Sequence, residues 1–220
     1  MMTSKEAILS RIRQSKGRQA LDAARRLDVE KRIAERKPFL VPARAQLGVE
    51  ELRTLFIAKA EEVSARVLVL RSKSDMPAAI RPLLDESGLA YRLAVSPDPW
   101  FDGIDWNEFE IHKGTPRPDD MAGLAHAKAG IAETGTLMLS SGAASPTLMN
   151  FMPDLHIVAL SESRILGTYE DAWDMQRRES NAMPRAINLI TGPSRTGDIE
   201  QTILLGAHGP RRLVILLIED

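Results

Sequence analysis

The sequence predicts an α/β fold, with a parallel-rich sheet flanked by helices. Residues 49–63 have the apolar spacing of an amphipathic helix, and Arg66–Leu70 is an apolar run bounded by charges, typical of a buried strand. A second helix and a second strand follow, the strand over residues 89–95. This alternation of helices and strands is the pattern of parallel strands joined by crossover helices.

Local signals mark the ends of these elements. Ser74 and Asp75 precede Pro77 where the second helix begins, and Gly88 stops that helix. The alternation continues in the second half of the chain. We expect strands over residues 124–131, 136–140, 155–160, 186–190 and 212–218, and helices over residues 169–178 and 198–205.

The composition is that of a globular protein, with 44% apolar and 27% charged residues. There are no cysteines, which excludes disulfides and cysteine-ligated iron–sulfur clusters or zinc in this chain. The four histidines, His112, His126, His156 and His208, show no metal-ligand spacing, so we expect no metal site. We expect His156, at the start of a strand, to be buried with its hydrogen bonds satisfied.

The amino terminus lacks the apolar stretch of a signal peptide. The longest apolar runs have six residues, whereas a membrane span needs about 20. We therefore expect a cytoplasmic protein without a membrane span. We also expect no nucleic-acid partner.

Residues 1–41 are predicted to form a helical arm and residues 42–220 an α/β domain. The first 37 residues hold eleven Lys/Arg and five Asp/Glu, with apolar residues on one face of two helices, or of one helix broken near Gly17. Pro38 and Pro42 end this arm. Either the arm docks on its own domain or on a partner, or its basic face contacts an anionic surface.

A long loop over residues 96–121 interrupts the alternation. It holds four prolines, and Trp100, Phe101, Trp106 and Phe109 lie among many acids. Long loops inside a domain are usually functional or mobile. Either these aromatic side chains pack on the core, or the loop is a lid or a partner surface.

Three glycine-rich segments carry the residues best suited to chemistry, and the first is a tight turn at residues 130–136. Glu133 is the candidate catalytic residue, as a base or a nucleophile. Thr134, Gly135 and Thr136 are candidate ligand contacts near a strand end. The alternative is a plain hairpin or βα turn with an exposed acid.

The second segment, residues 191–200, lies between a predicted strand and a predicted helix, where free N–H groups and the helix dipole favour an anion. Arg195 suits a carboxylate or a phosphate, and Asp198 also suits a helix cap. No P-loop, dinucleotide fingerprint or nucleophile elbow is present. The candidate ligand contacts are Gly192, Ser194, Arg195, Thr196 and Asp198.

The third segment, residues 206–210, adds His208 and Gly209 as candidate ligand contacts. His208 can donate to an anion or move a proton, or else it is simply bonded to the backbone of its loop. The segments together predict a glycine-rich, anion-binding pocket at the ends of parallel strands.

These segments, at residues 132–136, 192–200 and 206–210, occur in the order and rough spacing of the lactate-utilisation (LUD) domain family. Pro153-Asp154-Leu155-His156-Ile157 is also similar to the start of a strand in that family. The chain resembles the family from about residue 40 onward, and most of all its lactate utilization protein C branch. Gly197 stands where alanine is common, and residues 146–152 match less well, so no site is assigned there.

The resemblance implies a fold like that of the NagB/RpiA/CoA-transferase group and a role in oxidising L-lactate to pyruvate within a multisubunit complex. It implies partner subunits that carry iron–sulfur clusters, with no cofactor in this cysteine-free chain. Whether this subunit is catalytic stays open. The alternatives are a stand-alone enzyme of CoA-transferase or cyclo-ligase type that uses Glu133, and a scaffold that senses an anionic metabolite.

Overall fold

The structure, a computed structural model, describes residues 3–17, 22–37, 41–180, 182–197 and 203–220. The chain divides into two compact units, Met1–Leu40 and Val41–Asp220. The second unit contains all three sheets of the described chain and all three glycine-rich segments.

The first unit consists of two helices, α1 (Ser4–Ser15) and α2 (Ala23–Glu35), which confirms the two-helix alternative. Thr3 caps α1 in a capping box with Glu6, and Asp22 caps α2. Neither helix buries a residue. The docking role of this helical arm therefore stays a prediction.

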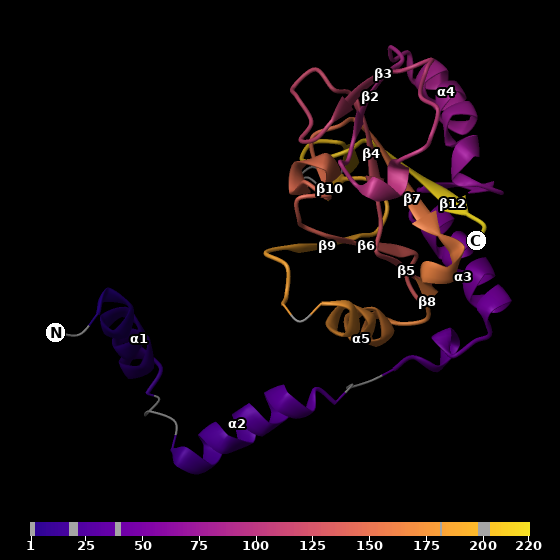
Figure 1. Ribbon diagram of the computed structural model, residues 1–220. Helices are drawn as coiled ribbons and strands as arrows, with labels where there is room; N and C mark the ends of the chain where they lie inside the picture. Colours follow the sequence, from indigo (N-terminus) through magenta and orange to yellow (C-terminus); the bar gives the residue numbers. More distant parts are fainter. Residues whose placement is uncertain (1–2, 18–21, 38–40, 181, 198–202) are drawn as a thin grey trace. The chain divides into compact units, whose positions relative to one another are not determined.

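The second unit is built on a six-stranded sheet (Figure 1). Every pair of neighbouring strands in this sheet is parallel. The predicted fold class, a parallel-rich sheet flanked by helices, is confirmed. From edge to edge the strands are β1 (Arg66–Leu70), β12 (Arg212–Ile218), β7 (Leu155–Ser161), β4 (Ala122–His126), β2 (Arg92–Val95) and β3 (Glu110–Lys113).

Two helices, α3 (Val49–Glu62) and α4 (Met76–Ser87), cover opposite faces of this sheet. In β12, Ile215 packs in the apolar cluster that contains α3 residues, whereas Leu216 packs in the cluster that contains α4 residues. Because successive side chains of a strand point to opposite faces, the two clusters lie on the two sides of the sheet.

Across the described ranges, no helix has both the length and the apolar character to cross a membrane.

A second, smaller sheet packs against α5 (Tyr169–Glu179) (Figure 1). Its strands, in order, are β8 (Ile165–Leu166), β5 (Ala129–Ile131), β6 (Thr136–Ser140) and β9 (Ile187–Ile190). The β5–β6 pair and the β6–β9 pair are antiparallel, whereas β5 and β8 are parallel. The predicted turn at residues 130–136 is therefore the hairpin between β5 and β6.

The predicted single strand over residues 124–131 is wrong, because it is two strands, β4 and β5, in different sheets. Between them the Ala127 N–H donates to the oxygen of Ala159 in the main sheet at 2.9 Å. The next N–H, of Lys128, donates to the oxygen of Met138 in the small sheet at 2.8 Å. The chain changes sheets at this point without any break in its apolar pattern.

The predicted helix over residues 198–205 is also wrong in its described part. Ile203–Leu205 is β11, which pairs antiparallel with β10 (Arg195–Gly197). Residues 198–202, and with them the predicted cap Asp198, lie outside the described residues. Tertiary pairing overrides helix propensity here, and residues 203–205 form a strand where the sequence predicts a helix.

The long loop packs its aromatic side chains on the core, which confirms that alternative. Phe101 is buried, and Trp100, Trp106 and Phe109 are partly buried against the cluster that contains α4 residues. The loop also contains β3, an edge strand of the main sheet that the sequence analysis missed.

Gly135 allows a test of the contact between the β5–β6 turn and α3. Its φ of 66° is in the left-handed region, and an added Cβ would lie 2.2 Å from the Ala60 amide nitrogen. We predict that Gly135→Ala lowers the free energy of unfolding by about 2–4 kcal/mol, because both backbone strain and steric overlap must be relieved. Urea denaturation followed by circular dichroism measures this change.

The matched control is Gly142→Ala, because a Cβ added at Gly142 meets no atom within 4 Å. We expect this variant to stay within about 0.5 kcal/mol of the wild type. Equal destabilisation by the two substitutions would contradict the close contact with α3.

Candidate functional site

A cavity of about 280 Å³ lies at the amino-terminal ends of β7 and β12, next to the end of β9. A water molecule takes up about 30 Å³ in the liquid, so the cavity has room for a small organic ion. Polar side chains on its wall belong to Asn150, His156, Thr191, Ser194, Arg195 and His208. Residues of the second and third predicted segments line it together. The cavity lies at the amino ends of the parallel strands β7 and β12. The second segment follows β9, which is antiparallel to its neighbour β6.

Backbone contacts bring the two loops of the cavity together. Gly192 has a φ of 75°, and an added Cβ would lie 2.3 Å from the oxygen of Val63, so the chain turns closely against the end of α3. The Ser194 N–H donates to the oxygen of Pro210 at 2.8 Å, and the Gly206 N–H donates to the oxygen of Ser194 at 3.0 Å. Loops far apart in sequence thereby share one wall.

Two residues of this wall each have a buried polar atom without a hydrogen-bond partner, the Oδ1 of Asn150 and the Nε2 of His156. Asn150 is 2% exposed and His156 is 1% exposed. An unpaired buried polar group costs about 1–3 kcal/mol, so such atoms mark a place where water or a ligand completes the bonding. His156 is buried as expected, but the expectation that its hydrogen bonds are satisfied is wrong at Nε2.

Burial also sets the charge of His156. Loss of hydration lowers the pKa of its imidazole to about 4, because a low-dielectric site disfavours the charged form. At neutral pH the ring is uncharged and carries a single N–H donor. The cavity wall therefore offers a neutral imidazole rather than a cation at this position.

Arg195 lines the cavity and is tethered to the C-terminal end of α3. Its Nη2 donates to the backbone oxygen of Val63 at 3.4 Å and to the hydroxyl of Ser64. The negative end of the helix dipole favours a cation here. The side chain is exposed, and a guanidinium has five N–H donors, so the tether leaves donors for a ligand.

Glu133, from the first predicted segment, does not line this cavity. Its buried carboxylate accepts the N–H of Tyr169, the first residue of α5, at 3.0 Å. A carboxylate at this position compensates the positive end of the helix dipole. The catalytic role of Glu133 stays a prediction, and the contact observed here is a helix cap.

The threonines of the same segment form a chain of hydroxyl groups. The Oγ1 of Thr136 lies 2.7 Å from that of Thr134 and 2.7 Å from that of Thr191. It also lies 3.0 Å from the hydroxyl of Tyr169. Because Thr191 lines the cavity, Thr136 supports the cavity wall from behind without reaching the interior.

The structure thus brings together some of the predicted ligand contacts and adds new ones. Those on the cavity wall are Gly192, Ser194, Arg195, His208 and Gly209, and those away from it are Thr134, Gly135, Thr136 and Thr196. Asn150 and His156 were missed as site residues. The available signal was a histidine inside an apolar strand, since a fully buried imidazole requires partners.

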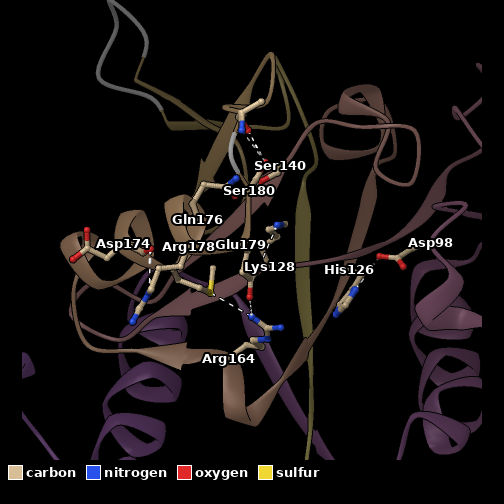
Figure 2. A network of polar contacts seen from close by, with 12 residues as sticks. Asp98, His126, Lys128, Ser140, Arg164, Asp174, Gln176, Arg178, Glu179 and Ser180 are labelled. Carbon is tan, nitrogen blue, oxygen red and sulfur yellow. Dashed lines mark hydrogen bonds and ion pairs between the residues drawn. The ribbon is translucent and has the colours of Figure 1, made fainter. Parts of the chain in front are cut away.

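A second polar cluster lies at the carboxyl end of β4 (Figure 2). The Nδ1 of His126 is 3.0 Å from the Oδ2 of Asp98, and the imidazole stacks on Trp100 with ring centroids 4.3 Å apart. Burial lowers the pKa of His126, and the hydrogen bond with Asp98 opposes this only in part. Neither His126 nor Asp98 is among the site residues predicted from the sequence.

Ion pairs beside this cluster hold α5 in place (Figure 2). Glu179 accepts from Arg164, and from the Nζ of Lys128 at 3.3 Å. The hydrogen bond from Arg164 is the main cause that lowers the pKa of Glu179. Within the described part of the chain, no three His, Asp or Glu side chains are grouped as a metal site would require.

The buried histidine predicts a specific pH dependence of stability. Because the pKa of His156 is about 4 in the folded state and near 6.5 in the unfolded chain, the unfolded chain binds more protons between these values. We predict that this contribution to the unfolding free energy, of order 3 kcal/mol, is present above pH 6.5 and lost as the pH falls toward 4. Urea denaturation across this range measures it.

His156→Leu should flatten the dependence of the unfolding free energy on pH between 6.5 and 4. The smaller contribution of His126, whose pKa is also lowered, should remain. The exposed His208 provides the control, since an equal flattening in His208→Gln would show that the effect does not come from the buried histidine. An unchanged slope in His156→Leu would contradict the burial of a neutral imidazole.

Comparison with known proteins places the chain in a family. The sequence profile of the LUD domain matches residues 121–218. A solved structure of a DUF162 family protein from Deinococcus radiodurans has a similar fold, with a TM-score of 0.57 and 22% identity, covering 78% of this chain and 99% of that one.

Curated relatives agree with this. "Uncharacterized protein NMB1437" of Neisseria meningitidis serogroup B is 42% identical over 97 residues, 44% of this chain but only 42% of that protein. "Lactate utilization protein C" of Bacillus pumilus is 27% identical over 241 aligned positions, 100% of this chain and 98% of that protein. "Uncharacterized protein YkgG" of Escherichia coli is 30% identical over 171 residues, 74% of this chain and 71% of that protein. The chain belongs to the LUD domain family, and several of the relatives it resembles are named lactate utilization protein C.

Proposed function

We propose that this protein acts in lactate utilisation, as a cysteine-free subunit of a cytoplasmic system that oxidises L-lactate to pyruvate. The alignment of the whole chain with Lactate utilization protein C of Bacillus pumilus supports the pathway. Partner subunits would hold the iron–sulfur clusters, because this chain has no cysteine with which to bind one.

The observation that carries the proposal is the pair of unpaired buried atoms, Asn150 Oδ1 and His156 Nε2, beside Arg195. A 2-hydroxy acid matches these groups. Its carboxylate would accept from the Arg195 guanidinium, and its hydroxyl would donate to the Oδ1 of Asn150. The neutral imidazole of His156 would complete the hydrogen bonding through Nε2.

The alternative of a stand-alone enzyme has less support, because it uses the carboxylate of Glu133. That carboxylate caps α5 and lies outside the cavity. The alternative of a sensing scaffold differs from a subunit in its partners, so an experiment on partners separates these two.

L-lactate should bind more tightly than propionate, which has a similar carboxylate but no hydroxyl. The hydroxyl supplies the donor that the Oδ1 of Asn150 lacks, so we expect about a tenfold difference in Kd, measured by calorimetry on the full chain. Asn150→Leu should remove the difference between the two acids. The control is Asn188→Leu, because the Nδ2 of Asn188 is also buried and unpaired but lies outside the cavity wall. Equal Kd values for both acids in the wild type would overturn the assignment.

Purification of the tagged full chain from lactate-grown cells should recover partner proteins that contain iron and acid-labile sulfide. The physical reason is that electrons leaving lactate need a carrier that this chain cannot hold. Cells grown without lactate provide the comparison. Recovery of the chain without iron, together with normal growth on lactate after its deletion, would argue against a subunit role.

A further inference from the structure

A second cavity, of about 220 Å³, adjoins the first along the amino-terminal edge of the main sheet. The two cavities share Pro193, Arg195 and Leu213 as a common wall. Four guanidinium groups line the second cavity, those of Arg66, Arg195, Arg211 and Arg212. None of the other three arginines lines the first cavity, so the two spaces differ in charge.

Strand pairing explains why these arginines converge. Arg66 is the first residue of β1, Arg212 is the first residue of β12, and the two strands are neighbours in the sheet. Arg211 directly precedes β12 and its N–H donates to the oxygen of Asp154 at 2.9 Å, before β7. Arg195, the first residue of β10, lines the same cavity.

The carboxylates nearby compensate only part of this charge. Arg66 pairs with Glu86 at 2.6 Å. Arg211 lies 3.3 Å from Asp154, and Arg212 lies 4.0 Å from it. Four guanidinium groups therefore meet two carboxylates. A cavity lined by an excess of one charge concentrates ions of the opposite charge.

The remaining lining is apolar. Leu83, Leu155 and Val214 are nearly fully buried and form part of the wall. A ligand that suits this cavity combines a strongly anionic group with an apolar or ring portion. Planar guanidinium forks bind phosphate through paired N–H donors, and an excess of two positive charges matches a dianion.

We propose that this second cavity binds the phosphate or pyrophosphate group of a small phosphorylated metabolite. The site is separate from the one proposed for lactate, although Arg195 borders both. Binding here does not depend on lactate binding, and the two sites are tested by different variants.

Inorganic pyrophosphate is the probe, titrated into the full chain by calorimetry at low salt. Arg66→Gln and Arg211→Gln should each weaken pyrophosphate binding about tenfold or more, while L-lactate binding stays within twofold of the wild type. Arg81→Gln is the control, because Arg81 is as exposed as Arg66, at 50%, and pairs with Glu108 at 2.8 Å, but does not line this cavity.

Two results would overturn the proposal. One is no detectable pyrophosphate binding by the wild type at millimolar concentration. The other is an equal loss in Arg81→Gln, which would mean that overall charge rather than this cavity attracts the anion. Asn150→Leu should keep pyrophosphate binding. The pyrophosphate experiment therefore tests the second cavity even if L-lactate does not bind to the first.

Discussion

The pairing of β7 with β12 is the constraint on which the rest of the structure depends. The two parallel strands pair along seven residues, with Leu155 opposite Arg212 and His156 opposite Leu213. Both lie near the middle of the sheet and are almost wholly buried. Because strands in this register begin level with each other, the segments that lead into them must meet at one edge. Both cavities lie at that edge.

This edge differs from the opposite one in how its polar groups are paired. At the carboxyl edge His126 bonds to Asp98, Glu179 bonds to Lys128 and Arg164 nearby, and only the buried hydroxyl of Ser96, directly after β2, lacks a partner among these groups. At the amino edge, atoms of Asn150 and His156 are buried without partners, and arginines outnumber carboxylates. Unpaired buried groups and uncompensated charge both lower stability unless something binds them. The physical case for a ligand site is therefore stronger at the amino edge.

The helices and most strands were predictable because the local order of apolar and polar residues differs between an amphipathic helix and a buried strand. β1, β7 and β12 are continuous apolar runs, and α3 and α4 have amphipathic spacing with clear end signals. The failures occurred where pairing rather than periodicity decides the structure. The run over residues 124–131 changes sheets at Lys128, and Ile203–Leu205 pairs with Arg195–Gly197 instead of forming a helix. Neither event changes the local pattern of apolar residues.

By itself the sequence determined the α/β class, the absence of cysteine chemistry, and the glycine-rich loops that carry Ser194, Arg195 and His208. Only the tertiary structure decided which edge of the sheet these loops occupy, and that Glu133 caps a helix outside the cavity. It also decided that His156 and Asn150 lie inside the cavity wall. The reason is that a side chain's type can be read locally, whereas its neighbours depend on the register of strands that are distant in sequence.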